Sequence, residues 1–222
     1  MTMQTSKNSL NYNDLFIYLL AFSSGFSIMC VELLAGRILA PFFGSSVHIW
    51  GSIITVFMLS LSLGYLFGGK ISTRSASLTR YGAIFIFAGI TLLPIVTSSN
   101  WLMESIFLAI EDSRYGSLLA STVLFFIPTI ILGMLSPYSV RLLVKNSNES
   151  GQIAGRLYFV STLGSALGTI ITSFYFVMWF EIDSIIVTVS LVLSVLGLTA
   201  IVVDKVTAKD KSTLTEGEIR HA

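Results

Sequence analysis

The chain has 222 residues, of which 54% are hydrophobic and only 11% are charged, and its mean hydropathy is +0.83. Soluble domains carry about 25% charged residues, so this composition nearly excludes a soluble enzyme, a nucleic-acid-binding protein and a disordered scaffold. The formal net charge of +1 provides no general attraction to acidic partners. One cysteine and two histidines exclude a disulfide framework and argue against a metal centre built from these residues. We therefore expect a membrane protein without a metal or cofactor.

A transmembrane helix needs about 20 mostly apolar residues, because each residue rises about 1.5 Å through about 30 Å of hydrocarbon. Six stretches meet this requirement, at residues 15–36, 47–69, 81–98, 115–136, 157–179 and 184–203. Polar or helix-breaking residues separate them, beginning with Pro41 and Gly44. The sequence therefore predicts an all-α integral membrane protein. Its six-helix domain covers 15–203, between a cytoplasmic N-terminal segment at 1–14 and a flexible cytoplasmic tail at 204–222.

The distribution of basic residues predicts the orientation. With a cytoplasmic N-terminus, all of the 13 basic residues except Arg37 and Arg114 fall in inner segments. The three tryptophans, Trp50, Trp101 and Trp179, then fall at the outer interface, where aromatic belts form. We expect a multi-pass protein of the bacterial inner membrane with both chain ends in the cytoplasm.

The segment at 100–113 has a different pattern. It is too short to span a bilayer, and its apolar residues Leu102, Ile106 and Ala109 share one helical face. We interpret it as an interfacial helix on the outer surface. The alternative is a structured loop that covers the bundle.

The two halves of the chain resemble each other weakly. Residues 63–68 read LGYLFG and residues 163–168 read LGSALG, 100 residues later. Residues 36–41 and 133–137 both run from a glycine to a proline, at an offset of 96 to 97. Three helices in each half would give an inverted repeat, which is a transporter architecture. The alternative is coincidence, because Leu-Gly pairs are common in membrane helices.

Four glycines stand at helical spacing within these segments, namely Gly64 and Gly68 in the first and Gly164 and Gly168 in the second. Glycine at an interval of four residues lets helix backbones approach closely. We expect them to pack helices within the chain. A homodimer interface is the alternative.

Charged residues within or beside the spans are the candidate substrate-binding residues. Glu32, Arg37 and His48 lie near the predicted outer side, and a charge at such depth costs about 3 kcal/mol on insertion scales. Five helical residues rotate by about 500°, so Glu32 and Arg37 are poorly placed to pair on one straight helix. The three residues would line a polar cavity for a cationic ligand or a proton relay. The alternative is a charge network that holds the first helix to its neighbours.

At the predicted inner side stand Arg141, Arg156 and Tyr158. Their simplest role is to anchor helices at the cytoplasmic interface. The alternative is a cytoplasmic gate or a docking surface for a soluble partner.

Residues 31–72 resemble the opening membrane segment of the membrane-bound spermidine-synthase-like family, often described as fused major-facilitator/spermidine-synthase proteins. The matching features are Glu32, Gly36, Arg37, Ala40, Pro41, Gly44, Ser45, Trp50, Gly64, Gly68 and Gly69. A second segment, from Gly155 through Tyr158 and on to Gly168, is similar to the family's fifth-helix motif. The resemblance implies a fold similar to half of a major-facilitator transporter.

Typical members of that family continue into a soluble aminopropyltransferase domain, and no residue here matches its catalytic positions. The resemblance therefore implies a non-catalytic membrane module without enzymatic activity of its own. We expect it to bind or transport a small polar or cationic molecule such as a polyamine, in contact with the lipid bilayer and without nucleic acid. The alternative is a scaffold or assembly subunit that docks a separately encoded synthase-like protein.

Overall fold

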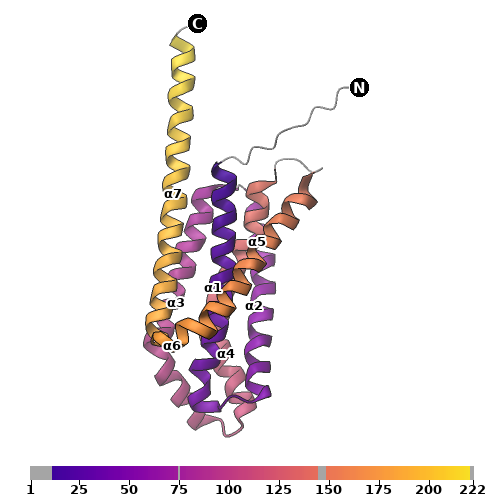
Figure 1. Cartoon of the computed structure of the whole chain (residues 1–222), viewed down its shortest axis with the longest axis vertical. Coiled ribbons are helices and arrows are strands. Elements are labelled where there is room, and N and C mark those ends of the chain that lie inside the picture. Colours follow the sequence, from indigo (N-terminus) through magenta and orange to yellow (C-terminus); the bar gives the residue numbers. More distant parts are fainter. Residues whose placement is uncertain (1–11, 75, 145–148, 221–222) are drawn as a thin grey trace.

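The computed structural model describes residues 12–74, 76–144 and 149–220, and all the regular structure in them is helical. The elements are α1 (Tyr12–Phe43), α2 (Val47–Arg74), α3 (Leu78–Ala109), α4 (Ser113–Leu143), α5 (Ser150–Ile171), the π-helical segment η2 (Thr172–Phe176), α6 (Val177–Trp179) and α7 (Ile182–Arg220). Six of the helical stretches in these residues are long and apolar enough to cross a membrane, as predicted. Helix α1 begins and α7 ends at the same end of the bundle, which we call the terminal end (Figure 1). Most of the predicted segment 1–14 lies outside the described residues.

The first helix is longer than predicted. Pro41 lies inside α1, which continues to Phe43, so its interpretation as a helix breaker was wrong. A proline near a helix C-terminus removes only one backbone hydrogen bond, and here the Gly44 N–H still donates to the Ala40 carbonyl at 2.9 Å. Helix α1 ends at Phe43, and the next residue is Gly44. Its φ of +86° lies in a region that residues with a side chain rarely adopt.

The separate interfacial helix predicted at 100–113 was also wrong, because α3 continues without a break to Ala109. The apolar face of this segment packs within the bundle, where Met103 and Ile106 are buried. Phe107 contacts Phe43 of α1 edge to face, with ring centroids 6.1 Å apart. The far end, opposite the terminal end, is therefore an extension of the helical bundle.

The backbone at 204–220, predicted as a flexible tail, continues α7 to Arg220. The segment has no proline to stop the helix. Its first residue, Asp204, accepts hydrogen bonds from the Thr79 N–H at 2.9 Å and from the Thr79 hydroxyl at 2.5 Å. A carboxylate at the N-terminus of α3 satisfies helical N–H groups that have no partner within the helix. This bond joins α7 to α3 at the terminal end.

The fifth span is not a uniform α-helix. After Ile171 the chain forms η2, then the single turn α6, and it turns at Phe180 into α7. Figure 1 shows this elbow, where α6 lies across the bundle beside the start of α7. Pi-helical segments bend helices and are frequent at functional sites.

Three helix pairs make the most extensive contacts: α2 with α4, α1 with α5, and α3 with α7. Between the first two pairs, glycines lie directly against the facing backbone, and we call these two interfaces the glycine seams. In the first seam Gly64 meets the carbonyl oxygen of Ile130, Gly68 meets that of Met134 and Gly133 meets that of Leu61. In the second seam Gly164 meets the carbonyl oxygen of Phe22, Gly168 meets that of Phe26 and Gly25 meets that of Ser161.

The two seams are images of each other. Adding 100 to each α2 residue number and subtracting 108 from each α4 residue number converts the contacts of the first seam into those of the second. The α3–α7 interface obeys the same rule, since the Gly82–Gly197 contact becomes the contact between Gly89 and Ser190. The halves run in opposite directions, so an approximate two-fold axis relates them. The predicted offset of 100 between α2 and α5 is confirmed.

The predicted offset of 96 to 97 between the first and fourth helices was wrong. That alignment matched Gly36 with Gly133, but Gly36 meets the indole of Trp50, whereas Gly133 lies in a glycine seam. The residue equivalent to Gly133 is Gly25, 108 residues earlier. Pro41 and Pro137 recur in the sequence, but neither takes part in the glycine–carbonyl contacts that the two seams share.

Two neighbouring glycines offer a direct test of the seams. A Cβ atom at Gly68 would overlap the backbone of Met134, whereas one at Gly69 would meet nothing within 4 Å. We expect Gly68→Ala to lower the free energy of unfolding by about 1–3 kcal/mol, as overpacked interfaces do. Gly69→Ala should leave it unchanged or raise it by up to about 1 kcal/mol through helix propensity. Unfolding in mixed detergent micelles measures both, and equal stability of the two variants would contradict the close approach of α2 and α4.

Candidate functional site

A cavity lies between α1, α2, α4 and α5, with a volume of about 430 Å³. We call it the central cavity. Its lining consists of Ser24, Gly25, Ile28, Met29, Leu61, Tyr65, Ser136, Pro137, Tyr158, Ser161, Thr162 and Ser165. The cavity borders both glycine seams, because Gly25, Leu61 and Ser161 belong to it and to a seam.

The central cavity lies on the approximate two-fold axis. The offsets that relate the seams also relate lining residues of one half to lining residues of the other. Four such pairs line it: Leu61 with Ser161, Tyr65 with Ser165, Ile28 with Ser136, and Met29 with Pro137. Membrane transporters with inverted repeats bind their substrates at this place, where the repeats meet near the middle of the bilayer.

Hydroxyl groups dominate the polar part of the lining. Ser165 uses its hydroxyl within the second seam, 3.2 Å from the carbonyl oxygens of both Gly25 and Ser161. The hydroxyls of Ser136, Ser161 and Thr162 make no hydrogen bond with any residue that the structure describes. Each can donate one hydrogen bond and accept others, so this wall can hold a polar ligand.

Glu32 lies next to the central cavity along α1. It is four residues after Ile28 and three after Met29, so it occupies the same helical face one turn further on. Its side chain is partly buried, and no hydrogen bond or ion pair links its carboxylate to another described residue. A carboxylate within a membrane span normally faces a partner or an aqueous cavity. Glu32 is not among the lining residues of the central cavity, but it lies one helical turn from Ile28 and Met29, which are.

Arg37 lies at a different place. It lines a hollow of about 600 Å³ at the elbow, together with Asn100 of α3, with Glu181 just before α7 and with Asp183 in the first turn of α7. Helix geometry explains the separation, because five residues place Glu32 and Arg37 on different faces of α1. The structure thus groups Arg37 with the two acidic residues of the elbow.

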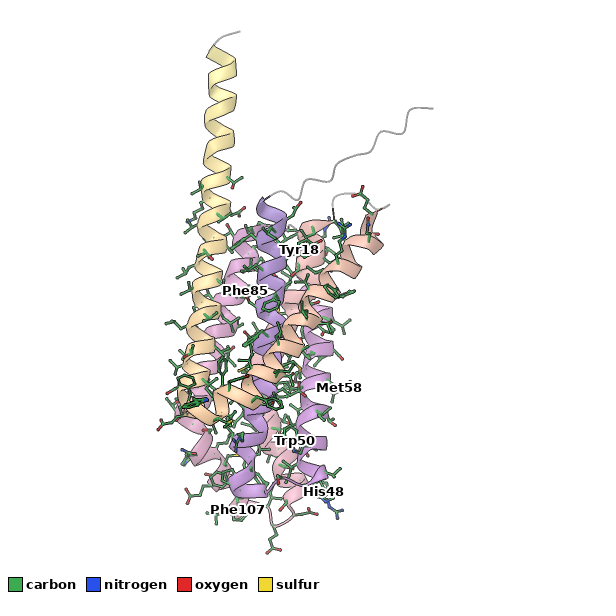
Figure 2. All side chains as sticks on the ribbon, viewed as in Figure 1. Tyr18, His48, Trp50, Met58, Phe85 and Phe107 are labelled. Carbon is green, nitrogen blue, oxygen red and sulfur yellow. The ribbon has the colours of Figure 1, made fainter. Side chains whose placement is uncertain are left out.

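His48 stands at the start of α2, at the far end of the bundle, where Figure 2 shows it on the outside. Its side chain is exposed, and it lines neither the central cavity nor the hollow at the elbow. Trp50, two residues later, lies against Gly36 of α1, where a Cβ atom would be 2.7 Å from the indole. Of Glu32, Arg37 and His48, only Arg37 lines the central cavity or the hollow at the elbow, so neither space unites the three residues as predicted.

The residues predicted as a cytoplasmic gate or docking surface are separated as well. Arg141 near the end of α4 and Arg156 near the start of α5 are both exposed at the terminal end. Tyr158 is also exposed, and it lines the central cavity. Among the described residues, no group of three or more histidine, cysteine, aspartate or glutamate side chains is placed to hold a metal ion.

Sequence reasoning missed the hydroxyl wall. Ser136, Ser161 and Thr162 are unremarkable within apolar helices, where serine and threonine often bond to their own backbone. The signal that identifies them is the repeat offset, which aligns Ser161 with Leu61 and Ser136 with Ile28. That signal needs the contacts of the folded chain, because the sequence alone gave a wrong offset for the first and fourth helices.

Comparisons of the chain with protein families, with curated proteins and with solved structures found no match. The resemblance to the spermidine-synthase-like membrane family and to half of a major-facilitator transporter therefore stays a prediction.

Two serines on one helix test the cavity. Ser136 lines it, whereas Ser139, three residues later, is fully buried and hydrogen-bonded to the Tyr81 hydroxyl. In a background with the buried Cys30 replaced by alanine, we expect Ser136→Cys to react with a small cationic methanethiosulfonate reagent. Ser139→Cys should stay unlabelled in the folded protein, as mass spectrometry would show. Labelling of both cysteines, or of neither, would contradict an accessible polar cavity at this place.

Proposed function

We propose that this protein is a membrane module that binds a small cationic molecule in the central cavity and moves it across the bilayer. The observation that carries the proposal is the carboxylate of Glu32, which makes no ion pair with another described residue, one helical turn from a hydroxyl-lined cavity on the two-fold axis. A cationic ligand supplies the partner that this carboxylate lacks, and charges inside membrane spans usually have such a partner.

The lining suits an alkylammonium ion in two further ways. Tyr65 of α2 and Tyr158 of α5 both line the central cavity, and the faces of tyrosine rings attract cations. The free hydroxyls of Ser136, Ser161 and Thr162 can accept hydrogen bonds from an ammonium group, which is a donor only. The methylene groups between the charges of a polyamine would contact Ile28 and Met29.

The position of the cavity supports transport rather than simple binding. In inverted-repeat transporters, one repeat rocks against the other around a fixed central site, which opens the site to each side in turn. Here α2 and α5 pack against α4 and α1 and make little contact with each other. Each pair joins one helix of each half, and the central cavity lies between the two pairs, so a movement of one pair relative to the other would change its access.

A matched pair of ligands tests binding. Putrescine at about 100 times its dissociation constant should stabilise the purified protein by about 2.7 kcal/mol, measured by thermal unfolding. The diol 1,4-butanediol has the same chain length without charge and should produce no shift. Glu32→Gln should abolish the putrescine shift while the melting temperature without ligand stays close to that of the parent.

The control variant is Glu104→Gln, because Glu104 is an exposed residue of α3 that lines neither cavity. It should retain the full putrescine shift. An equal shift in Glu32→Gln, or equal effects of putrescine and the diol, would refute a cation site at Glu32. Uptake of radiolabelled putrescine into proteoliposomes then tests transport, and binding without uptake would limit the function to binding.

A further inference from the structure

The hollow at the elbow is a second polar site, separate from the central cavity. It has a volume of about 600 Å³ and lies between the far-end half of α1, the middle of α3 and the turn from α6 into α7. Its charged lining comes from both sides: Arg37 belongs to α1, while Glu181 precedes α7 and Asp183 lies in the first turn of α7. The hollow therefore presents a cation and two anions around one space.

None of these three charges is neutralised by contact within the described protein. The side chains of Arg37, Glu181 and Asp183 are exposed, and none makes a hydrogen bond or an ion pair with another described residue. Exposed ion pairs form readily when the side chains can reach each other, although each contributes little to stability. The structure instead leaves the opposite charges apart, with Asn100 available as a further hydrogen-bonding group.

The residues around the hollow are also of the kind that is found at the headgroup region of a bilayer. Trp101 follows Asn100 directly, Trp179 is the last residue of α6, and the indoles are 70% and 75% exposed. Exposed tryptophans concentrate at the headgroup level of a bilayer, because the ring is apolar and its N–H is polar. Phe42 and Phe180 contribute an apolar part of the lining that acyl chains or a glycerol backbone can contact.

From this arrangement we infer that the hollow binds a zwitterion that joins an anionic phosphate to an ammonium group. The guanidinium of Arg37 takes the phosphate, for which its planar set of donors is suited. The carboxylates of Glu181 and Asp183 take the ammonium group, which donates up to three hydrogen bonds. The zwitterion is the headgroup of a phospholipid such as phosphatidylethanolamine or a free molecule such as phosphoethanolamine, which carry the same chemistry.

The test titrates detergent-purified protein with phosphatidylethanolamine and with phosphatidylglycerol of identical acyl chains, and counts bound lipid by native mass spectrometry. We expect phosphatidylethanolamine to bind about tenfold more tightly, since phosphatidylglycerol lacks the ammonium group and is repelled by the two carboxylates. Arg37→Gln should weaken phosphatidylethanolamine binding about tenfold, the size of one lost charge-assisted contact. The double variant Glu181→Gln/Asp183→Asn should remove the preference between the two lipids.

The matched control is Arg114→Gln, because Arg114 is an exposed arginine at the same end of the bundle that does not line the hollow. This variant should bind both lipids as the parent does, and thermal unfolding without added lipid should show that all variants are folded. Competition by free phosphoethanolamine distinguishes the sources: effective competition identifies a soluble zwitterion, and its failure identifies the lipid. Unchanged phosphatidylethanolamine binding in Arg37→Gln, or equal binding of the two lipids by the parent protein, would overturn the inference.

Discussion

Direct contact between glycine and the backbone of a facing helix holds this protein together. Within a bilayer, lipid tails are as apolar as the helices, so helices associate through close packing rather than through the hydrophobic effect. Gly64 and Gly164 each lie against a carbonyl oxygen, in two seams that the two-fold axis relates. These seams fix α2 to α4 and α5 to α1, and the space that remains between the two pairs is the central cavity. The site thus depends on the same contacts as the fold.

The two polar sites share one helix without sharing a face. Glu32 adjoins the central cavity and Arg37 lines the hollow at the elbow, although only five residues separate them. A straight helix turns by about 500° over that distance, which places the carboxylate and the guanidinium about 140° apart. The opposite charges of Glu32 and Arg37 therefore point away from each other on α1. His48, exposed at the start of α2, lines neither the central cavity nor the hollow at the elbow.

Local features of the sequence predicted the number of spans, the glycines of the seams and the 100-residue offset between α2 and α5. They failed where the outcome depends on contacts distant in sequence. Helix α3 continues through 100–109 because Met103 and Ile106 are buried in the bundle, which hydropathy does not reveal. The helical continuation past residue 203 is anchored by the bond between Asp204 and Thr79, 125 residues apart. The hydroxyl wall was missed for the same reason, since its serines become a site only when α4 and α5 meet α1.

The approximate symmetry has a consequence for how a ligand can be recognised. Two identical three-helix chains related by a two-fold axis would be forced to present the same groups on both sides of a central cavity. In one continuous chain the equivalent positions can carry different residues, and here Ser165 is the counterpart of Tyr65 and Ser136 is the counterpart of Ile28. The first half therefore contributes most of the aliphatic lining, and the second half contributes most of the serine and threonine hydroxyls. A cavity of this kind can distinguish the two ends of an unsymmetrical molecule and hold it in a single orientation.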